Sequence, residues 1–85
     1  MSIRLLFFAS LRERLDSSGE SLELPSHVRT VGELRAFLAT RGEPWQGALD
    51  GQRALRMAVN QDLADANAAI RDGDEVAFFP PVTGG

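Results

Sequence analysis

The sequence contains no cysteine and no lysine. Without cysteine, the chain has no disulfide bond, no thiolate metal ligand and no cysteine nucleophile. Its nine cationic side chains are therefore all arginine, and a guanidinium group stays protonated. Because the chain has no side-chain amine on which to accept an isopeptide bond, we expect any amine that becomes joined to its C-terminus to belong to another protein.

Long apolar runs and excess basic charge are also missing, and histidine is scarce. No apolar run is long enough to span a bilayer and no secretory signal pattern is present, so we expect a cytoplasmic protein without membrane contact. The formal net charge of −3 argues against nucleic acid as the main partner. His27 is the single histidine, no residues have metal-ligand spacing, and the glycines match no nucleotide-binding motif. We expect no resident cofactor, no metal and no self-contained active site.

Eighty-five residues with 44% apolar side chains predict one small domain around one core. Apolar periodicity predicts strands over 3–9, 20–24, 56–60, 63–64 and 75–79, and helices over 10–17, 31–41 and 44–49. Ile70 is expected to fill the core before a turn at Asp72-Gly73-Asp74. This order predicts an α+β domain over residues 1–79, with one long helix packed across one face of a mixed sheet and short extra helices beside it.

Helix ends carry their own sequence patterns. Ser10 with Glu13, and Thr30 with Glu33, match capping boxes at the starts of two helices. Gly19 is expected to supply the left-handed stop of the first helix, and Gly42 to close the second.

Alternation along the strands predicts which side chains face solvent. Arg4, Arg56 and Glu75 assign the same side of the sheet to solvent. The inward set is then Ile3, Leu5, Phe7, Met57, Val59, Val76 and Phe78. Four apolar side chains, with Ala77, are expected to share the exposed face, and they are Leu6, Phe8, Phe79 and, from the neighbouring short strand, Leu63. A contiguous apolar patch of this kind indicates a protein contact.

The last residues form a tail, 80–85, that follows the final strand directly. Pro80 and Pro81 stiffen the segment and remove two backbone donors, so it cannot pair fully as a strand. Val82 and Thr83 lead to Gly84 and Gly85, which lack side chains that would block entry into a narrow tunnel. We expect Gly85 to carry a free carboxylate that a partner enzyme can activate.

The whole chain resembles the small, sulfur-carrier subunits of molybdopterin synthase, which are ubiquitin-like β-grasp proteins. The resemblance is strongest in residues 7–13 and 58–63 and in residues 72–85, which read DGDEVAFFPPVTGG. It implies a β-grasp fold, with the first and last strands parallel in the middle of the sheet. In the middle of the chain the similarity is one of pattern, with Trp45 as the clearest match.

The resemblance also implies a function. An E1-like enzyme would use ATP to adenylate Gly85, and sulfur from a persulfide donor would then convert it into a thiocarboxylate. The charged chain would dock on the large synthase subunit, typically in a heterotetramer with two copies of each. There it would donate sulfur to cyclic pyranopterin monophosphate, with acid/base groups supplied by the large subunit. The family's exposed hydrophobic contacts correspond here to Phe8, Leu63 and Phe79.

Three other interpretations remain open at this point. A thiamin-pathway sulfur carrier shares the fold, the diglycine tail and the activation chemistry, although its tail generally lacks the Phe-Phe-Pro-Pro-Val-Thr run. A ubiquitin-like protein modifier would be joined through Gly85 to lysines of its targets. A plain interaction module would have an inert tail.

Overall fold

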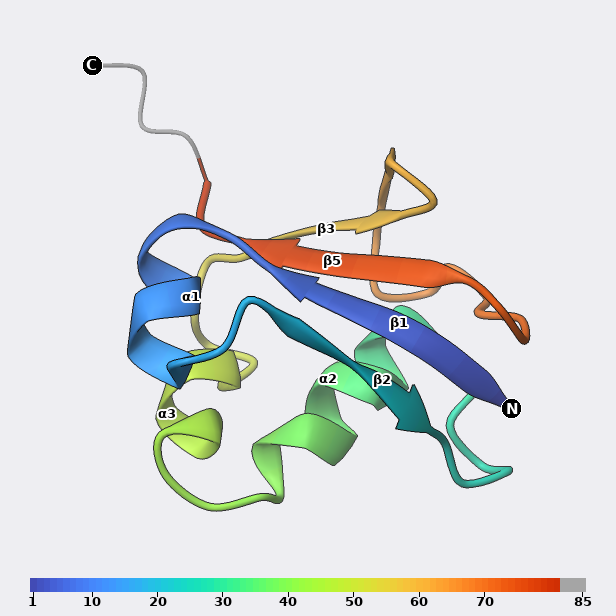
Figure 1. The fold of residues 1–85 in the computed structure, drawn as a ribbon, viewed down its shortest axis with the longest axis horizontal. Coiled ribbons are helices and arrows are strands. Elements are labelled where there is room, and N and C mark those ends of the chain that lie inside the picture. The colour runs from blue at the N-terminus through green and yellow to red at the C-terminus, as the bar shows by residue number, and fades with distance from the viewer. Residues whose placement is uncertain (82–85) are drawn as a thin grey trace.

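A mixed sheet of five strands forms the frame of the molecule in the computed structural model, which describes residues 1–81 (Figure 1). The strands lie in the order β2-β1-β5-β3-β4. β1 and β5 pair in parallel at the centre, and the other neighbours are antiparallel. Their bounds are β1 Ser2–Phe7, β2 Gly19–Glu23, β3 Arg56–Val59, β4 Asp62–Ala64 and β5 Glu75–Phe79. The predicted strands and their central parallel pair are confirmed, with boundaries that differ by at most two residues.

Three helices lie on one side of this sheet (Figure 1). They are α1 (Ala9–Leu15), α2 (Val31–Ala39) and α3 (Trp45–Leu49). α2 is the longest, yet with nine residues it ends two residues earlier than predicted. The predicted short extra helices are present as α1 and α3, and the helix predicted to be long is only the longest of three short ones. No helix within residues 1–81 has the length and apolar character needed to cross a membrane.

The core lies between the inner face of the sheet and the helices. Phe7 is its centre, because its ring stacks on Phe78 at 6.3 Å between centroids and meets Trp45 edge-on at 5.6 Å. The Arg41 guanidinium covers the outer side of Trp45, 4.5 Å from the ring centroid. The predicted inward residues of the central strands are all buried, as is Ile70, and they are Ile3, Leu5, Phe7, Val76 and Phe78. Met57 and Val59 of β3 pack against this core and are half-buried.

Two of the predicted helix signals differ in outcome. Thr30 and Glu33 form the capping box of α2, since Thr30 Oγ1 accepts a hydrogen bond from the Glu33 amide at 3.1 Å and the Glu33 carboxylate accepts one from the Thr30 amide at 3.1 Å. The predicted box at Ser10 and Glu13 is wrong. α1 begins at Ala9, its N-cap is Phe8 and no side chain caps it, so Ser10 already lies inside the first turn.

Gly19 also differs from its prediction. The left-handed residue that ends α1 is Asp16, with φ of 52°, and its amide donates to the Arg12 and Glu13 carbonyls. Gly19 instead opens β2 with φ of 147°, and a Cβ there would lie 2.1 Å from the Leu5 carbonyl oxygen. A glycine is thus required for the close approach of β2 to β1, not for the helix end.

The turn before β5 holds the two central strands in register. Gly73, with φ of 86°, donates its amide to the Ser2 carbonyl at 2.7 Å, and the Ser2 amide donates to Asp72 Oδ1 at 2.7 Å. The predicted turn at residues 72–74 is confirmed. Because β1 and β5 run parallel from this point, both end at the opposite edge of the molecule, where Phe8 and Phe79 lie.

Candidate docking surface and C-terminal tail

The outer face of the sheet carries an apolar strip, which we define as Leu6, Phe8, Leu63 and Phe79. The strand register fixes its geometry. Leu6 lies opposite Ala77, Ala77 opposite Ala58, and Ala58 opposite Leu63, so one row of side chains crosses four strands on the same face. The predicted outward positions of Leu6 and Leu63 are thereby confirmed, and Phe79 lies two residues along β5 from Ala77 on the same face.

Two members of the strip are exposed and two are half-buried. Phe8 exposes 45% of its surface and Leu63 exposes 71%, and they are the two large apolar residues of this part of the chain, 1–81, that are exposed. Phe79 is half-buried because its ring meets that of Phe8 edge-on, at 6.5 Å between centroids. Leu6 is half-buried within the row. An exposed apolar surface of this kind is typical of sites of protein contact.

Ala77 departs from its prediction of an exposed outward residue. It does point to the outer face, but its exposed fraction is 6%, and that of Ala58 beside it is 7%. Single methyl groups between the larger Leu6 and Leu63 are covered by their neighbours. The two alanines therefore form the floor of the strip.

Polar residues border the strip on both sides. Arg4 of β1 and Glu75 of β5 are register partners, and they lie two residues before Leu6 and Ala77. Arg56 of β3 is the register partner of Phe79. The Glu75 amide donates to Asn60 Oδ1 at 3.0 Å, which fixes the end of β3 against β5. An apolar centre with a charged rim is the usual anatomy of a protein interface.

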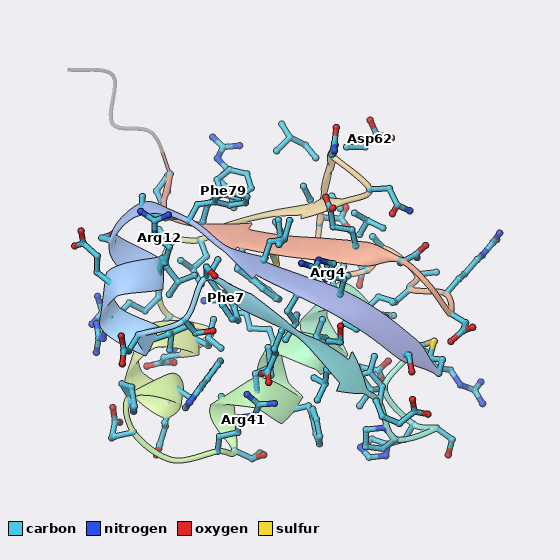
Figure 2. All side chains as sticks on the ribbon, in the orientation of Figure 1. Arg4, Phe7, Arg12, Arg41, Asp62 and Phe79 are labelled. Carbon is cyan, nitrogen blue, oxygen red and sulfur yellow. The ribbon has the colours of Figure 1, made fainter. Side chains whose placement is uncertain are left out.

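The tail begins next to the strip. β5 ends at Phe79, and Pro80 and Pro81 follow outside the sheet and half-buried, so the predicted break in strand pairing at Pro80 is confirmed. Figure 2 labels Phe79 at the end of β5 from which the chain continues toward its C-terminus. The remaining predicted tail residues, Val82, Thr83, Gly84 and Gly85, lie outside the described residues.

Sequence reasoning missed a second feature at this edge of the molecule. Arg14 of α1 and Arg53, which follows α3, line a hollow together with Pro80. The segment that carries Arg53 is held by Arg35 of α2, whose guanidinium donates to the carbonyls of Leu49 at 2.8 Å, Arg53 at 2.7 Å and Asp50. Burial lowers the pKa of Arg35, and the nearby Asp50 carboxylate opposes that effect. No local pattern marks these arginines, because packing between distant elements brings them together.

The described residues hold no cluster of three or more histidine, aspartate or glutamate side chains that could bind a metal. His27 is exposed in its loop. What residues 1–81 offer is a docking face beside the start of the tail.

The fold and this face define a class. The central parallel pair of strands, with helices on one face, makes the chain a ubiquitin-like β-grasp domain. Residues 5–85 match the model of the ThiS family, and the chain belongs to that family.

Known relatives are similar to this chain over almost their whole length. The chain is 43% identical, over 83 residues, to the molybdopterin synthase sulfur carrier subunit of Escherichia coli, covering 98% of this chain and 99% of the relative. In a complex of subunits 1 and 2 of the molybdopterin-converting factor from Helicobacter pylori, one chain matches with a TM-score of 0.66 at 26% identity, with both chains fully covered. The small archaeal modifier protein SAMP1 of Haloferax volcanii matches with a TM-score of 0.76 at 26% identity, again over both full chains.

Proposed function

We propose that this chain is the sulfur-carrier subunit of molybdopterin synthase and that Gly85 carries the sulfur. The observation that supports it best is the full-length similarity, at 43% identity, to a relative named for that role. Its site of action would be the cytoplasm, and the large synthase subunit would be its partner in a heterotetramer with two of each. The chain would act as an enzyme as the small subunit of molybdopterin synthase, a sulfurtransferase.

The chemistry follows from the properties of a carboxylate. Its oxygen is a poor leaving group, so an E1-like enzyme transfers AMP from ATP to the Gly85 carboxylate and releases pyrophosphate. The outer sulfur of a persulfide donor then attacks the adenylate and displaces AMP, which gives an acyl disulfide. A second thiol reduces that disulfide, so that the donor leaves as a disulfide and Gly85 carries a thiocarboxylate. This group is a sulfur nucleophile that needs no cysteine, in keeping with a chain that has none. It attacks cyclic pyranopterin monophosphate within the large subunit, and two rounds build the dithiolene of molybdopterin.

The tail residues would serve access and the apolar strip would serve binding. Gly84 and Gly85 carry no side chain that would obstruct a tunnel, and Pro80 and Pro81 stiffen the approach. The exposed rings and aliphatic groups of the strip supply apolar area to bury against the large subunit. The acid/base groups of the reaction belong to that partner.

The mass of the intact protein tests this proposal. After incubation with the E1-like enzyme, ATP and a sulfur donor, we expect a gain equal to the exchange of one oxygen for one sulfur, located at Gly85 by fragmentation. An unchanged mass counts against a carrier function. Deleting Gly85 should abolish sulfur transfer with the fold intact, because a terminal residue contributes little packing.

Two experiments in cells separate the alternatives. Loss of the gene should abolish molybdoenzyme activity, whereas thiamin auxotrophy would indicate the thiamin pathway. The similarity to an archaeal modifier makes conjugation the other alternative, and denaturing blots of cell extracts would then contain covalent ladders.

A further inference from the structure

Two guanidinium groups from separate elements converge on one glycine beside the tail. Arg53 donates its Nε hydrogen to the Gly47 carbonyl at 3.1 Å. A terminal nitrogen of Arg14 lies 2.7 Å from the position that a Cβ on Gly47 would occupy. Gly47 sits in the middle of α3 (Trp45–Leu49), so α1 and the segment after α3 each bring an arginine side chain against this glycine.

The absence of a side chain at position 47 is what admits both groups. A Cβ there would also lie 2.9 Å from Glu43 Oε2, so the Arg14 and Glu43 side chains share the space over the glycine. Glycine in a helix interior is less favourable than alanine. A helix of five residues therefore gives up local stability at the position where the arginines meet.

The two arginines keep most of their hydrogen-bonding capacity. Among residues 1–81, ion pairs join Met1 to Glu23 and Arg41 to Glu20, so neither Arg14 nor Arg53 forms one in this range. The Glu43 carboxylate lies beside Arg14 but too far from its guanidinium nitrogens to form an ion pair. Arg53 spends its Nε hydrogen on Gly47 and retains its terminal nitrogens. A guanidinium offers five donors in a planar fork that matches a carboxylate.

The hollow between them is apolar at its base. Leu11 and Ala48 are buried there, Leu55 and Pro80 are half-buried, and the residues that line it include no acidic side chain. Pro80 of the hollow directly follows Phe79 of the strip. We call this site the two-arginine hollow. It therefore lies at the residue where the tail begins.

We infer that the two-arginine hollow binds an aspartate or glutamate side chain of the large synthase subunit, presented from an apolar segment of that subunit. The inference rests on the proposed function and adds to it a charged contact at the base of the tail. The planar donors of a guanidinium group match the two oxygens of a carboxylate. The apolar residues of the hollow disfavour a group that keeps its full hydration shell. The large subunit is the occupant because Pro80 of the hollow directly follows Phe79 of the strip, and a relative of this chain is found in a complex of the two subunits.

Neutralising both arginines tests the inference. The variant Arg14→Gln/Arg53→Gln should raise the Kd for the large subunit about tenfold at low salt, as expected for the loss of charge-assisted hydrogen bonds. The difference in Kd between this variant and the unmodified chain should become smaller near 1 M salt, where the Debye length is about 3 Å. The matched control is Arg29→Gln/Arg71→Gln, which removes the same charge at a separate hollow beside Met1. Its Kd should stay within about twofold of the unmodified value.

A variant that leaves the charge unchanged isolates the geometry. Gly47→Ala should displace the Arg14 side chain and weaken binding about threefold, while the denaturant midpoint shows that the chain still folds. Unchanged affinity of the double variant overturns the inference, and so does an equal loss in the Arg29/Arg71 control. It is also overturned if the double variant binds normally but is no longer charged by the activating enzyme. Failure of the unmodified chain to bind the large subunit or to gain sulfur would instead reject the proposed function.

Discussion

Phe78 and Phe79 are adjacent residues of the same type, yet they lie on opposite faces of β5. Phe78 is fully buried and stacks on Phe7, whereas Phe79 is half-buried and meets the exposed ring of Phe8. The inner pair is enclosed by helices, and the outer pair is open to a partner. Alternation along a strand thus divides the apolar residues of one small sheet between the core and the outer face that carries the apolar strip.

Removing an inner ring gives the largest expected effect. Phe78→Ala leaves a cavity in a closed core, so the free energy of unfolding should fall by about 3–5 kcal/mol. Chemical denaturation followed by circular dichroism measures this change. A loss of less than about 1 kcal/mol would mean that the core is not centred on the Phe7 and Phe78 pair.

Removing an outer ring should change the affinity for the partner more than it changes the stability of the fold. Phe79→Ala or Phe8→Ala should weaken binding to the large subunit by roughly 1 kcal/mol or more, as for an interface anchor. The free energy of unfolding should change far less than in Phe78→Ala, because these rings are partly solvated already. Isothermal titration gives the affinity, and an affinity equal to that of the unmodified chain would move the docking face elsewhere.

The N-terminal cap of α2 should contribute to the stability of the fold, and α1 has no such cap. Thr30→Ala removes the acceptor for the Glu33 amide and should cost about 1 kcal/mol of unfolding free energy. Ser10→Ala is the matched control, because α1 has no side-chain cap and the change should fall within about 0.5 kcal/mol. Equal effects at both positions would contradict the different helix starts described above.

A smaller effect should appear in acid. Hydrogen bonds from the Arg29 amide, and more weakly from Thr30, lower the pKa of the Glu33 carboxyl below its ordinary value. With a lower pKa in the folded state, the carboxylate contributes stability above its unfolded pKa and loses it as the pH falls through the folded pKa. The stability gap between the unmodified chain and Glu33→Gln, followed by denaturation at several pH values, should shrink toward acid. A gap that stays constant with pH would show that the charge contributes nothing.

The sequence sufficed for most of the fold and for the apolar strip, because both depend on short-range patterns. Arg4, Arg56 and Glu75 marked the solvent side, and two-residue alternation then placed Leu6, Phe8 and Phe79. Thr30 with Glu33 succeeded since the helix start that they indicate is local. Ser10 with Glu13 had the same pattern and failed, because the turn after β1 started the helix one residue earlier.

Features that depend on distant contacts could not be predicted. Gly19 was misassigned because its need for glycine comes from the Leu5 carbonyl on the neighbouring strand. Ala77 was expected to be exposed because alternation does not describe how its neighbours cover it. The meeting of Arg14 and Arg53 over Gly47 depends on how α1 packs against α3, and no spacing along the chain indicates it.

Hydroxyl-radical footprinting tests the central claim most directly, because it reports the solvent access of individual side chains with and without the large subunit. The account predicts that oxidation of Phe8 and Leu63 falls in the complex. Phe37, which is half-buried on α2 and lines a hollow there with His27, should be oxidised equally in both states. Protection of Phe37 with continued oxidation of Phe8 and Leu63 would contradict the assignment of the outer sheet face as the docking surface.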